Sequence, residues 1–212
     1  LGGNGFYWRI ARHQEASGLF EIRRAEDGLR AWASEPGEYY NAFDGTYGGL
    51  WRRNGRAPQK LVGVGFTAQG TFRGMPYQRT CFDPEFDWVF EGIDSPIIGD
   101  FGFSGNGAAG FELDRVDPKL APGYEITVLA QSFATDENFI LVPEEQLTHL
   151  TNLSGSPENE VKRADMIYFK VPNGGRVFSV GSITFCGSLP WNNFDNSISQ
   201  LLLNVLSQSL ER

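Results

Sequence analysis

Short apolar segments separated by glycine-rich turns limit what this chain can fold into. Glycine accounts for 26 of the 212 residues, and 14% of the residues are aromatic. Glycine supplies the positive φ angles of tight turns, whereas aromatic and β-branched residues favour strands. Strand-like patterns occur at 18–23, 29–33, 61–66, 111–114, 125–131, 138–142, 166–171 and 176–183. The sequence therefore predicts many short strands joined by turns.

One segment near the end of the chain has the periodicity of an amphipathic helix. Its apolar residues recur at the spacing i, i+3, i+4, i+7 and i+8: Ile198, Leu201, Leu202, Val205 and Leu206. This pattern predicts a helix over 195–210, with Asn193 or Asp195 as its N-cap. Neither a linker nor an internal repeat divides the sequence. We expect one α/β domain over residues 1–212, with an irregular β-rich insertion.

Charge and length exclude two classes of partner. The chain has 18 Lys and Arg against 26 Asp and Glu, so its net charge is −8. A nucleic-acid backbone needs clustered basic residues, and we therefore expect no nucleic-acid binding. The apolar runs are far shorter than the ~18 residues that span a bilayer, which argues against a membrane protein. The sequence opens at Leu1 without an initiating Met, and we expect it to be part of a longer chain.

Histidine and cysteine are too scarce for the common zinc sites. The two histidines, His13 and His149, exclude a three-histidine zinc centre within one chain. The two cysteines, Cys81 and Cys186, cannot make a four-thiolate site. We interpret them as free thiols in a reducing compartment, which predicts a cytoplasmic location.

Oxygen donors are the more informative residues. Tyr7 directly follows a glycine turn, Tyr39 and Tyr40 lie in a long irregular segment, and Glu112 begins a predicted strand. Carboxylates suit hard cations, and a phenol needs a strongly polarising ion such as Fe(III) to bind as phenolate. Taken singly, such tyrosines are more often packing residues. Asn138 either presents its amide to a substrate or caps a turn.

Several segments in order along the chain carry a family resemblance. They are LGGNGFYWRI at 1–10, IRRAEDGLRAWASEPGEYY at 22–40, GGLWRRNGRAPQKLVGVGF at 48–66, IGDFGF at 98–103, AAGFELDR at 108–115, ADMIYF at 164–169 and GGRVFSVGSITFCGSLPWNNFDNSISQLLLNVL at 174–206. Together they resemble the C-terminal region of the large (beta) subunit in the N,N-dimethylformamidase family. The resemblance covers nearly the whole chain.

The resemblance implies a fold and a metal site. The fold would be a doubly wound α/β sheet like that of class I glutamine amidotransferases, here without its first strands. The site would hold one mononuclear Fe(III) through Tyr7, Tyr40 and Glu112, with Tyr39 as the alternative to Tyr40. Asn138 would be a catalytic-pocket residue beside the metal.

The resemblance also implies an activity and partners. The activity would be hydrolysis of the C–N bond of small linear amides such as N,N-dimethylformamide. The partners would be the amide, the remainder of a longer chain, a small subunit and further copies of the chain. Two positions depart from the pattern expected of an active amidase: Gly110 stands where a histidine is expected, and Trp191-Asn192-Asn193 lacks an expected acidic residue.

These departures keep other interpretations open. One is a non-catalytic binding or scaffold module on the same fold, because fold alone does not define function. Another is a sugar-binding module that uses exposed aromatic residues such as Trp51 and Trp191, which burial would explain equally well.

Overall fold

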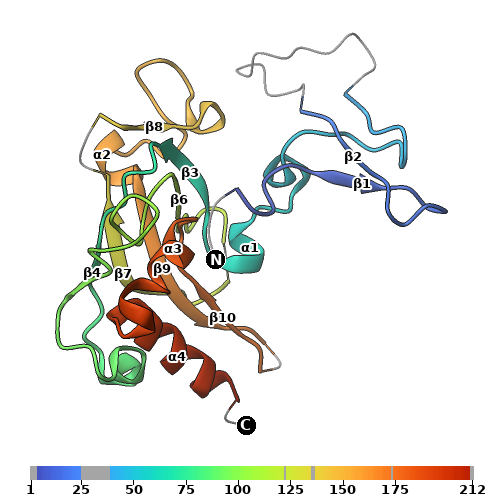
Figure 1. Cartoon of the computed structure of the whole chain (residues 1–212). Helices are drawn as coiled ribbons and strands as arrows, with labels where there is room; N and C mark the ends of the chain where they lie inside the picture. Colours follow the sequence, from blue (N-terminus) through green and yellow to red (C-terminus); the bar gives the residue numbers. More distant parts are fainter. Residues whose placement is uncertain (1–3, 25–38, 122, 135–136, 173, 211–212) are drawn as a thin grey trace.

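The structure is a computed structural model of the chain, and it describes residues 4–24, 39–121, 123–134, 137–172 and 174–210. Figure 1 shows two regions, an N-terminal lobe and a larger body from which the lobe extends to one side. The N-terminal lobe comprises residues 4–24 and 39–62, and the body comprises the described residues from 63 onward.

A five-stranded antiparallel sheet forms the centre of the body, in the order β10–β9–β7–β4–β5. Its strands are β4 (Tyr77–Arg79), β5 (Ile97–Ile98), β7 (Thr127–Phe133), β9 (Arg163–Lys170) and β10 (Arg176–Ser179). The segment from Ala164 to Phe169 in β9 is buried throughout. Such continuous burial is expected of a strand whose two faces are both covered.

A three-stranded antiparallel sheet in the order β6–β3–β8 lies beside it. Its strands are β3 (Gly65–Gly70), β6 (Glu112–Arg115) and β8 (Phe139–Leu141). Gln69 in β3 pairs with Glu112 on one side and with Ile140 on the other. The first residues of β6 and β8 therefore flank the same end of β3.

Helices are short, apart from the last one. They are η2 (Trp51–Asn54), α1 (Gln59–Val62), η3 (Pro84–Phe90), η4 (Pro143–Glu145), α2 (Glu158–Val161), α3 (Phe185–Ser188), η5 (Trp191–Phe194) and α4 (Ser197–Leu210). In the described part of the chain, no helix is both long and apolar enough to cross a membrane.

The apolar face of α4 closes the main core of the body. Ile198, Leu201 and Val205 are buried in one cluster with residues of η3 and the five-stranded sheet. Asn204 of α4 fixes the helix against η3, since its side-chain amide donates to the carbonyl oxygens of Val89 (3.1 Å) and Glu91 (2.9 Å). The predicted helix is confirmed with a start at Ser197.

The N-cap of α4 is neither of the two residues predicted. Asn196 Oδ1 accepts hydrogen bonds from the backbone N–H of Ile198 (3.0 Å) and Ser199 (2.9 Å), which is the geometry of an N-cap. Asn193 lies upstream in η5 with a φ of 54°.

The N-terminal lobe contains one small antiparallel ribbon. β1 (Ile10–Arg12) pairs with β2 (Phe20–Ile22), and the ribbon projects from the body in Figure 1. The segment 47–51 lies beside residues 8–9, which precede β1. Trp8 forms a β-bridge with Leu50, and the Arg9 N–H donates to the Gly49 carbonyl at 2.8 Å.

The doubly wound α/β fold expected from the resemblance is wrong. Every strand pairing among the described residues is antiparallel, and the sheets are joined mainly by loops. Parallel pairing needs long crossovers, usually helices. Among the helices of the described residues only α4 is longer than seven residues, and it follows the last strand. The arrangement is a set of antiparallel sheets with few helices.

Individual strand predictions fared better than the fold class. Strands are confirmed within 18–23, 111–114, 125–131, 138–142, 166–171 and 176–183. The predicted strand at 61–66 is instead the end of α1, a left-handed Gly63 (φ 79°) and the start of β3. The predicted strand at 29–33 lies outside the described residues.

Candidate metal centre and its surroundings

Tyr7 is buried where the lobe meets the body. Its ring packs edge-on against Phe66 of β3, with centroids 5.2 Å apart, and against Trp8 at 5.4 Å. Its hydroxyl donates to Glu144 Oε2 at 2.9 Å. Burial, and next the negative charge of Glu144, raise the pKa of Tyr7 far above its usual range. Tyr7 is therefore a protonated phenol held by an acidic acceptor.

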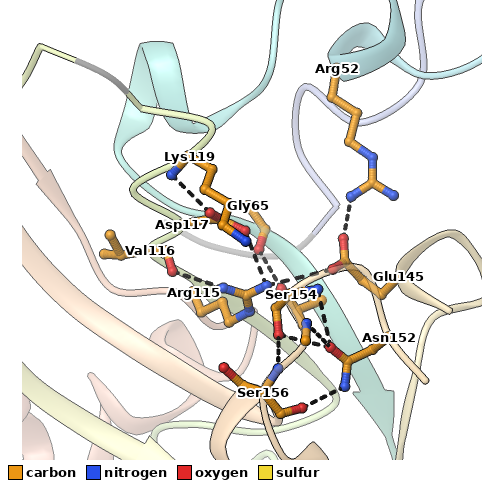
Figure 2. A network of polar contacts seen from close by, with 12 residues as sticks. Arg52, Gly65, Arg115, Val116, Asp117, Lys119, Glu145, Asn152, Ser154 and Ser156 are labelled. Atoms are coloured by element: carbon orange, nitrogen blue, oxygen red, sulfur yellow. Dashed lines mark hydrogen bonds and ion pairs between the residues drawn. The ribbon is translucent and has the colours of Figure 1, made fainter. Parts of the chain in front are cut away.

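Two arginines hold the short helix that carries this acceptor (Figure 2). Arg52 of η2 forms an ion pair with Glu145 and donates to the carbonyl oxygen of Glu144. Arg115, at the end of β6, approaches Glu145 Oε2 at 3.6 Å from another direction. Burial raises the pKa of Glu145, although the arginines oppose the shift. These contacts connect the lobe, η4 and β6 next to the acceptor of the Tyr7 hydroxyl.

Glu112 is also buried and is joined to the segment that carries Tyr7. Its Oε2 accepts a hydrogen bond from the Asn4 backbone N–H at 3.1 Å. The turn before it is braced by Ser182, whose Oγ accepts from the Gly110 N–H (2.8 Å) and donates to the Gly110 carbonyl (3.0 Å). Both predicted ligands therefore lie next to the turn at residues 4–6.

Each of these two residues is preceded by a phenylalanine with left-handed backbone. Phe6 has a φ of 57° and Phe111 a φ of 59°. Bulky residues rarely adopt positive φ, and such strain costs about 1–3 kcal/mol per residue and clusters at functional sites. Phe111 is held by stacking on Phe72, with centroids 4.1 Å apart and planes 3° apart. The chain thus presents Tyr7 and Glu112 from two strained turns.

Tyr40 and Tyr39 lie on the lobe, and their described contacts are with Tyr47 and Gly48. The Tyr40 side chain is 54% exposed, and its ring meets that of Tyr47 edge-on at 5.2 Å. Tyr39 stacks on Tyr47 at 6.3 Å, and its carbonyl accepts from the Gly48 N–H. The segment 47–51 connects this pair to Tyr7, whose carbonyl accepts from the Trp51 N–H at 3.0 Å.

Asn138 lies at the same end of the three-stranded sheet as Glu112. It directly precedes β8, its side chain is exposed, and its carbonyl accepts from the Thr71 N–H at 3.3 Å. The Thr71 carbonyl in turn accepts from the Phe111 N–H at 3.2 Å. This common backbone link keeps Asn138 near the turn that presents Glu112.

Gly110 has no room for the side chain expected there. A Cβ at this position would lie 2.8 Å from the Arg73 carbonyl oxygen and 3.0 Å from Gly74 Cα. The bridge between Met75 and Ala109 keeps the two segments close. A histidine at 110 would therefore require the 73–74 backbone to move.

The donor chemistry of Tyr7 and Glu112 fits a hard cation. Both are buried oxygen donors next to the 4–6 turn, and Glu144 accepts the hydrogen bond of the phenol. Within the described ranges, no three His, Cys, Asp or Glu side chains gather as a metal site. The remaining ligands of a centre here would therefore come from other oxygen donors, among which the sequence predicts Tyr40 or Tyr39.

The sequence reasoning missed Glu144 and its arginines. Their only sequence signal is the pair of acidic residues after Pro143, which resembles any solvated turn. Both carboxylates are nevertheless buried, because Arg52 and Arg115 reach Glu145 from segments distant in sequence and the Tyr7 hydroxyl bonds Glu144.

Comparison with known proteins places the chain in a family. The family described as N,N-dimethylformamidase beta subunit-like, C-terminal, matches residues 1–196. The N,N-dimethylformamidase beta subunit of Paracoccus aminophilus is 38% identical over 217 aligned residues, and that of an Alcaligenes species is 37% identical. Each alignment covers 100% of this chain and 28% of the relative. The chain belongs to this family, and it spans little more than a quarter of its relatives' length.

Proposed function

We propose that this chain is part of a hydrolase that cleaves the C–N bond of small linear amides such as N,N-dimethylformamide. Membership of the family and the names of the two relatives support this proposal. One structural observation carries it: strained residues, Phe6 and Phe111, directly precede Tyr7 and Glu112, and Glu112 accepts a hydrogen bond from Asn4, three residues before Tyr7. Strain of this kind is retained where a site requires it.

We propose a mononuclear Fe(III) as the cofactor, with Tyr7, Glu112 and Tyr40 as ligands and Tyr39 as the alternative to Tyr40. Iron would polarise the amide carbonyl as a Lewis acid. Tyr7 and Glu112 are supported by their burial and by their shared link to the 4–6 turn. Because the Tyr40 side chain is largely exposed, its part in the site requires the 39–47 segment to turn its phenol inward.

The surrounding residues have separate tasks. Glu144 accepts the 2.9 Å hydrogen bond of the Tyr7 hydroxyl and would take up its proton when the phenol binds a metal ion. Arg52 and Arg115 fix the short helix on which Glu144 lies. Asn138 offers an amide just before β8, near the start of β6, where a substrate amide can be oriented by hydrogen bonds. Overall, water is added across the C–N bond, and the products are a carboxylic acid and an amine.

The assembly and location are also proposals. Both relatives are named beta subunits, and this supports a small partner subunit and a multi-subunit complex. Their greater length supports a longer chain of which this segment is a part. Cys81 and Cys186 are both free thiols, which supports a cytoplasmic location.

Iron titration of the full-length protein tests the site. Tyrosinate bound to Fe(III) gives a visible charge-transfer band, and we expect Tyr7→Phe and Glu112→Gln to abolish or shift it. Tyr40→Phe and Tyr39→Phe identify the second phenol, since only one of them should change the band. Tyr124→Phe, a tyrosine in the body that packs on Phe169, is the matched control. A colourless protein that takes up no iron would refute the centre.

A non-catalytic module is the second candidate, and Gly110 favours it. The residue has neither a titratable side chain nor room for one. Amine release from a panel of small amides decides between the two. Iron binding without any amine release would support the binding module, whereas turnover that depends on Glu112 would exclude it.

A further inference from the structure

Three aromatic rings meet just before the terminal helix. The rings of Phe101 and Trp191 are stacked, with centroids 6.0 Å apart and planes 22° apart. The Phe103 ring lies 5.2 Å from that of Trp191 at an angle of 52°. Together with Asn192, Asp195 and Asn196 they line an open pocket of about 510 Å³. Because Phe103 is 71% exposed, its ring is accessible to a ligand.

The amide groups around this pocket are already used. Asn192 Nδ2 donates to the Asp195 carbonyl oxygen at 2.9 Å. Asn196 Nδ2 donates to two backbone carbonyls, and its Oδ1 caps α4. Among the described residues that line the pocket, Asp195 is the charged one, and it is exposed. The pocket therefore offers aromatic faces, one carboxylate and at most one remaining amide N–H, that of Asn192.

The backbone beside these rings is strained. Asn192, Asn193 and Phe194 have φ angles of 49°, 54° and 68°, so three consecutive residues are left-handed without glycine. Each such residue carries an energetic cost and persists only where its surroundings impose it. Here the hydrogen bonds of Asn192 and Asn196 hold the turn that aims Trp191 at Phe101.

We propose that this pocket binds an alkylated ammonium cation. The exposed ring of Phe103 offers its electron-rich surface to a cation. The methyl groups of the cation would lie against the aromatic surfaces that line the pocket, and the Asp195 carboxylate supplies the opposite charge. A sugar needs several hydrogen-bonding partners, and one remaining amide N–H does not provide them. The chain's net charge of −8 favours a cationic ligand as well.

The proposal also connects with the reaction, a link that rests on the proposed function. Hydrolysis of an N-alkylated amide releases an alkylamine. Amines with a pKa near 10 are protonated at neutral pH, as lysine is. The pocket would then hold the amine product as its alkylammonium form.

A pair of ligands of matched shape tests the role of charge. Choline and its neutral isostere 3,3-dimethyl-1-butanol differ in the central atom that carries the charge. Ligand-observed NMR on the full-length protein should show choline and dimethylammonium binding, with the neutral alcohol about tenfold weaker because it lacks the cation–π term. Equal binding of choline and the alcohol would overturn the proposal, as would binding of trehalose in place of choline.

Substitutions of pocket residues test whether choline binds in this pocket. We expect Phe103→Ala and Asp195→Asn each to weaken choline binding about tenfold, and both residues are exposed, so the fold should be retained. Phe82→Ala and Asp94→Asn, also at exposed positions, are the matched controls and should change nothing. Choline affinity that is unchanged in both pocket variants, or absent in the wild type, would refute the site.

The test is independent of the proposed amidase activity. Choline titration needs neither iron nor amide turnover. Loss of the amidase proposal would leave a cation pocket standing, and a negative titration would leave the Tyr7 and Glu112 centre untouched.

Discussion

The body and the N-terminal lobe are stabilised by different interactions. The body has a continuous apolar core that joins the five-stranded sheet, η3 and α4. The lobe buries few apolar side chains of its own, and its Tyr7 and Leu50 pack against Phe66 and Val142 of the body. Elsewhere in the lobe, arginines lie over aromatic rings, as Arg24 does over Trp8 at 4.5 Å.

This difference explains where the candidate centre lies. Tyr7 belongs to the lobe and Glu112 to the body, and Asn4 connects them. The lobe cannot position Tyr7 by its own packing, so the Arg52–Glu145 ion pair and the contact of Tyr7 with Phe66 must do so. We therefore expect iron binding to depend on interactions between the two regions.

The largest effect should come from the core of the body. Phe185 is fully buried in the main cluster, and Phe185→Ala should lower the free energy of unfolding by about 4 kcal/mol through lost burial and a cavity. Phe20→Ala, on the exposed ribbon of the lobe, should cost less than about 1 kcal/mol. Chemical denaturation measures both. Similar losses at the two positions would remove the contrast between the regions.

Breaking the contact between the regions should have the next largest effect. Arg52→Met leaves the buried Glu145 carboxylate with Arg115 as its remaining cation, at a cost of about 3 kcal/mol. Limited proteolysis should then cut the lobe faster than the body. Arg53→Met on the same short helix, at an exposed position, is the control, with a cost of at most about 1 kcal/mol. Unchanged proteolysis of the Arg52 variant would show that the lobe is held by other contacts.

The brace behind Glu112 should have a smaller effect on stability. Ser182→Ala leaves the buried Gly110 N–H without its acceptor, at a cost of about 1–2 kcal/mol. Because the turn that presents Glu112 loosens, Fe(III) affinity should fall as well. Thermal unfolding and metal titration measure the two effects. A loss of stability with unchanged Fe(III) affinity would show that this turn does not position a metal ligand.

The smallest effect should be a pH dependence within the lobe. Burial opposes the shift, but hydrogen bonds from Thr46 and Arg9 lower the pKa of Asp44 from 3.8 to about 2. A lowered pKa stabilises the fold above pH 3.8, and this contribution is lost as the pH falls towards 2. Asp44 lies at an exposed position, where solvent screens its charge, so the loss should be below about 1 kcal/mol. Acid titration of Asp44→Asn should lack this component, while Asp94→Asn should retain it.

The sequence predicted the local elements better than their assembly. The helix α4 follows from its periodicity, whereas strands such as β7 and β9 follow from short runs of apolar and β-branched residues. Periodicity does not say whether neighbouring strands run parallel, and the expected doubly wound sheet came from the resemblance alone. The signal against a doubly wound sheet was present in the sequence: loops, and not helices, connect the predicted strands.

The candidate site was predictable only in part, for a similar reason. Tyr7 and Glu112 stand out as oxygen donors beside glycine-rich turns, whereas Glu144 gains its role from a contact 137 residues away in sequence. The left-handed backbone of Phe6 and Phe111 was equally hidden, since phenylalanine carries no sequence signal for positive φ.

The close approach of Gly110 to the 73–74 loop has a consequence for protein engineering. Anyone who wishes to install an imidazole two positions before Glu112 must redesign both segments together, because the single replacement collides with backbone rather than with a movable side chain. A transplanted 71–75 loop, introduced in the same step, is the shorter route to a new acid–base group at this centre.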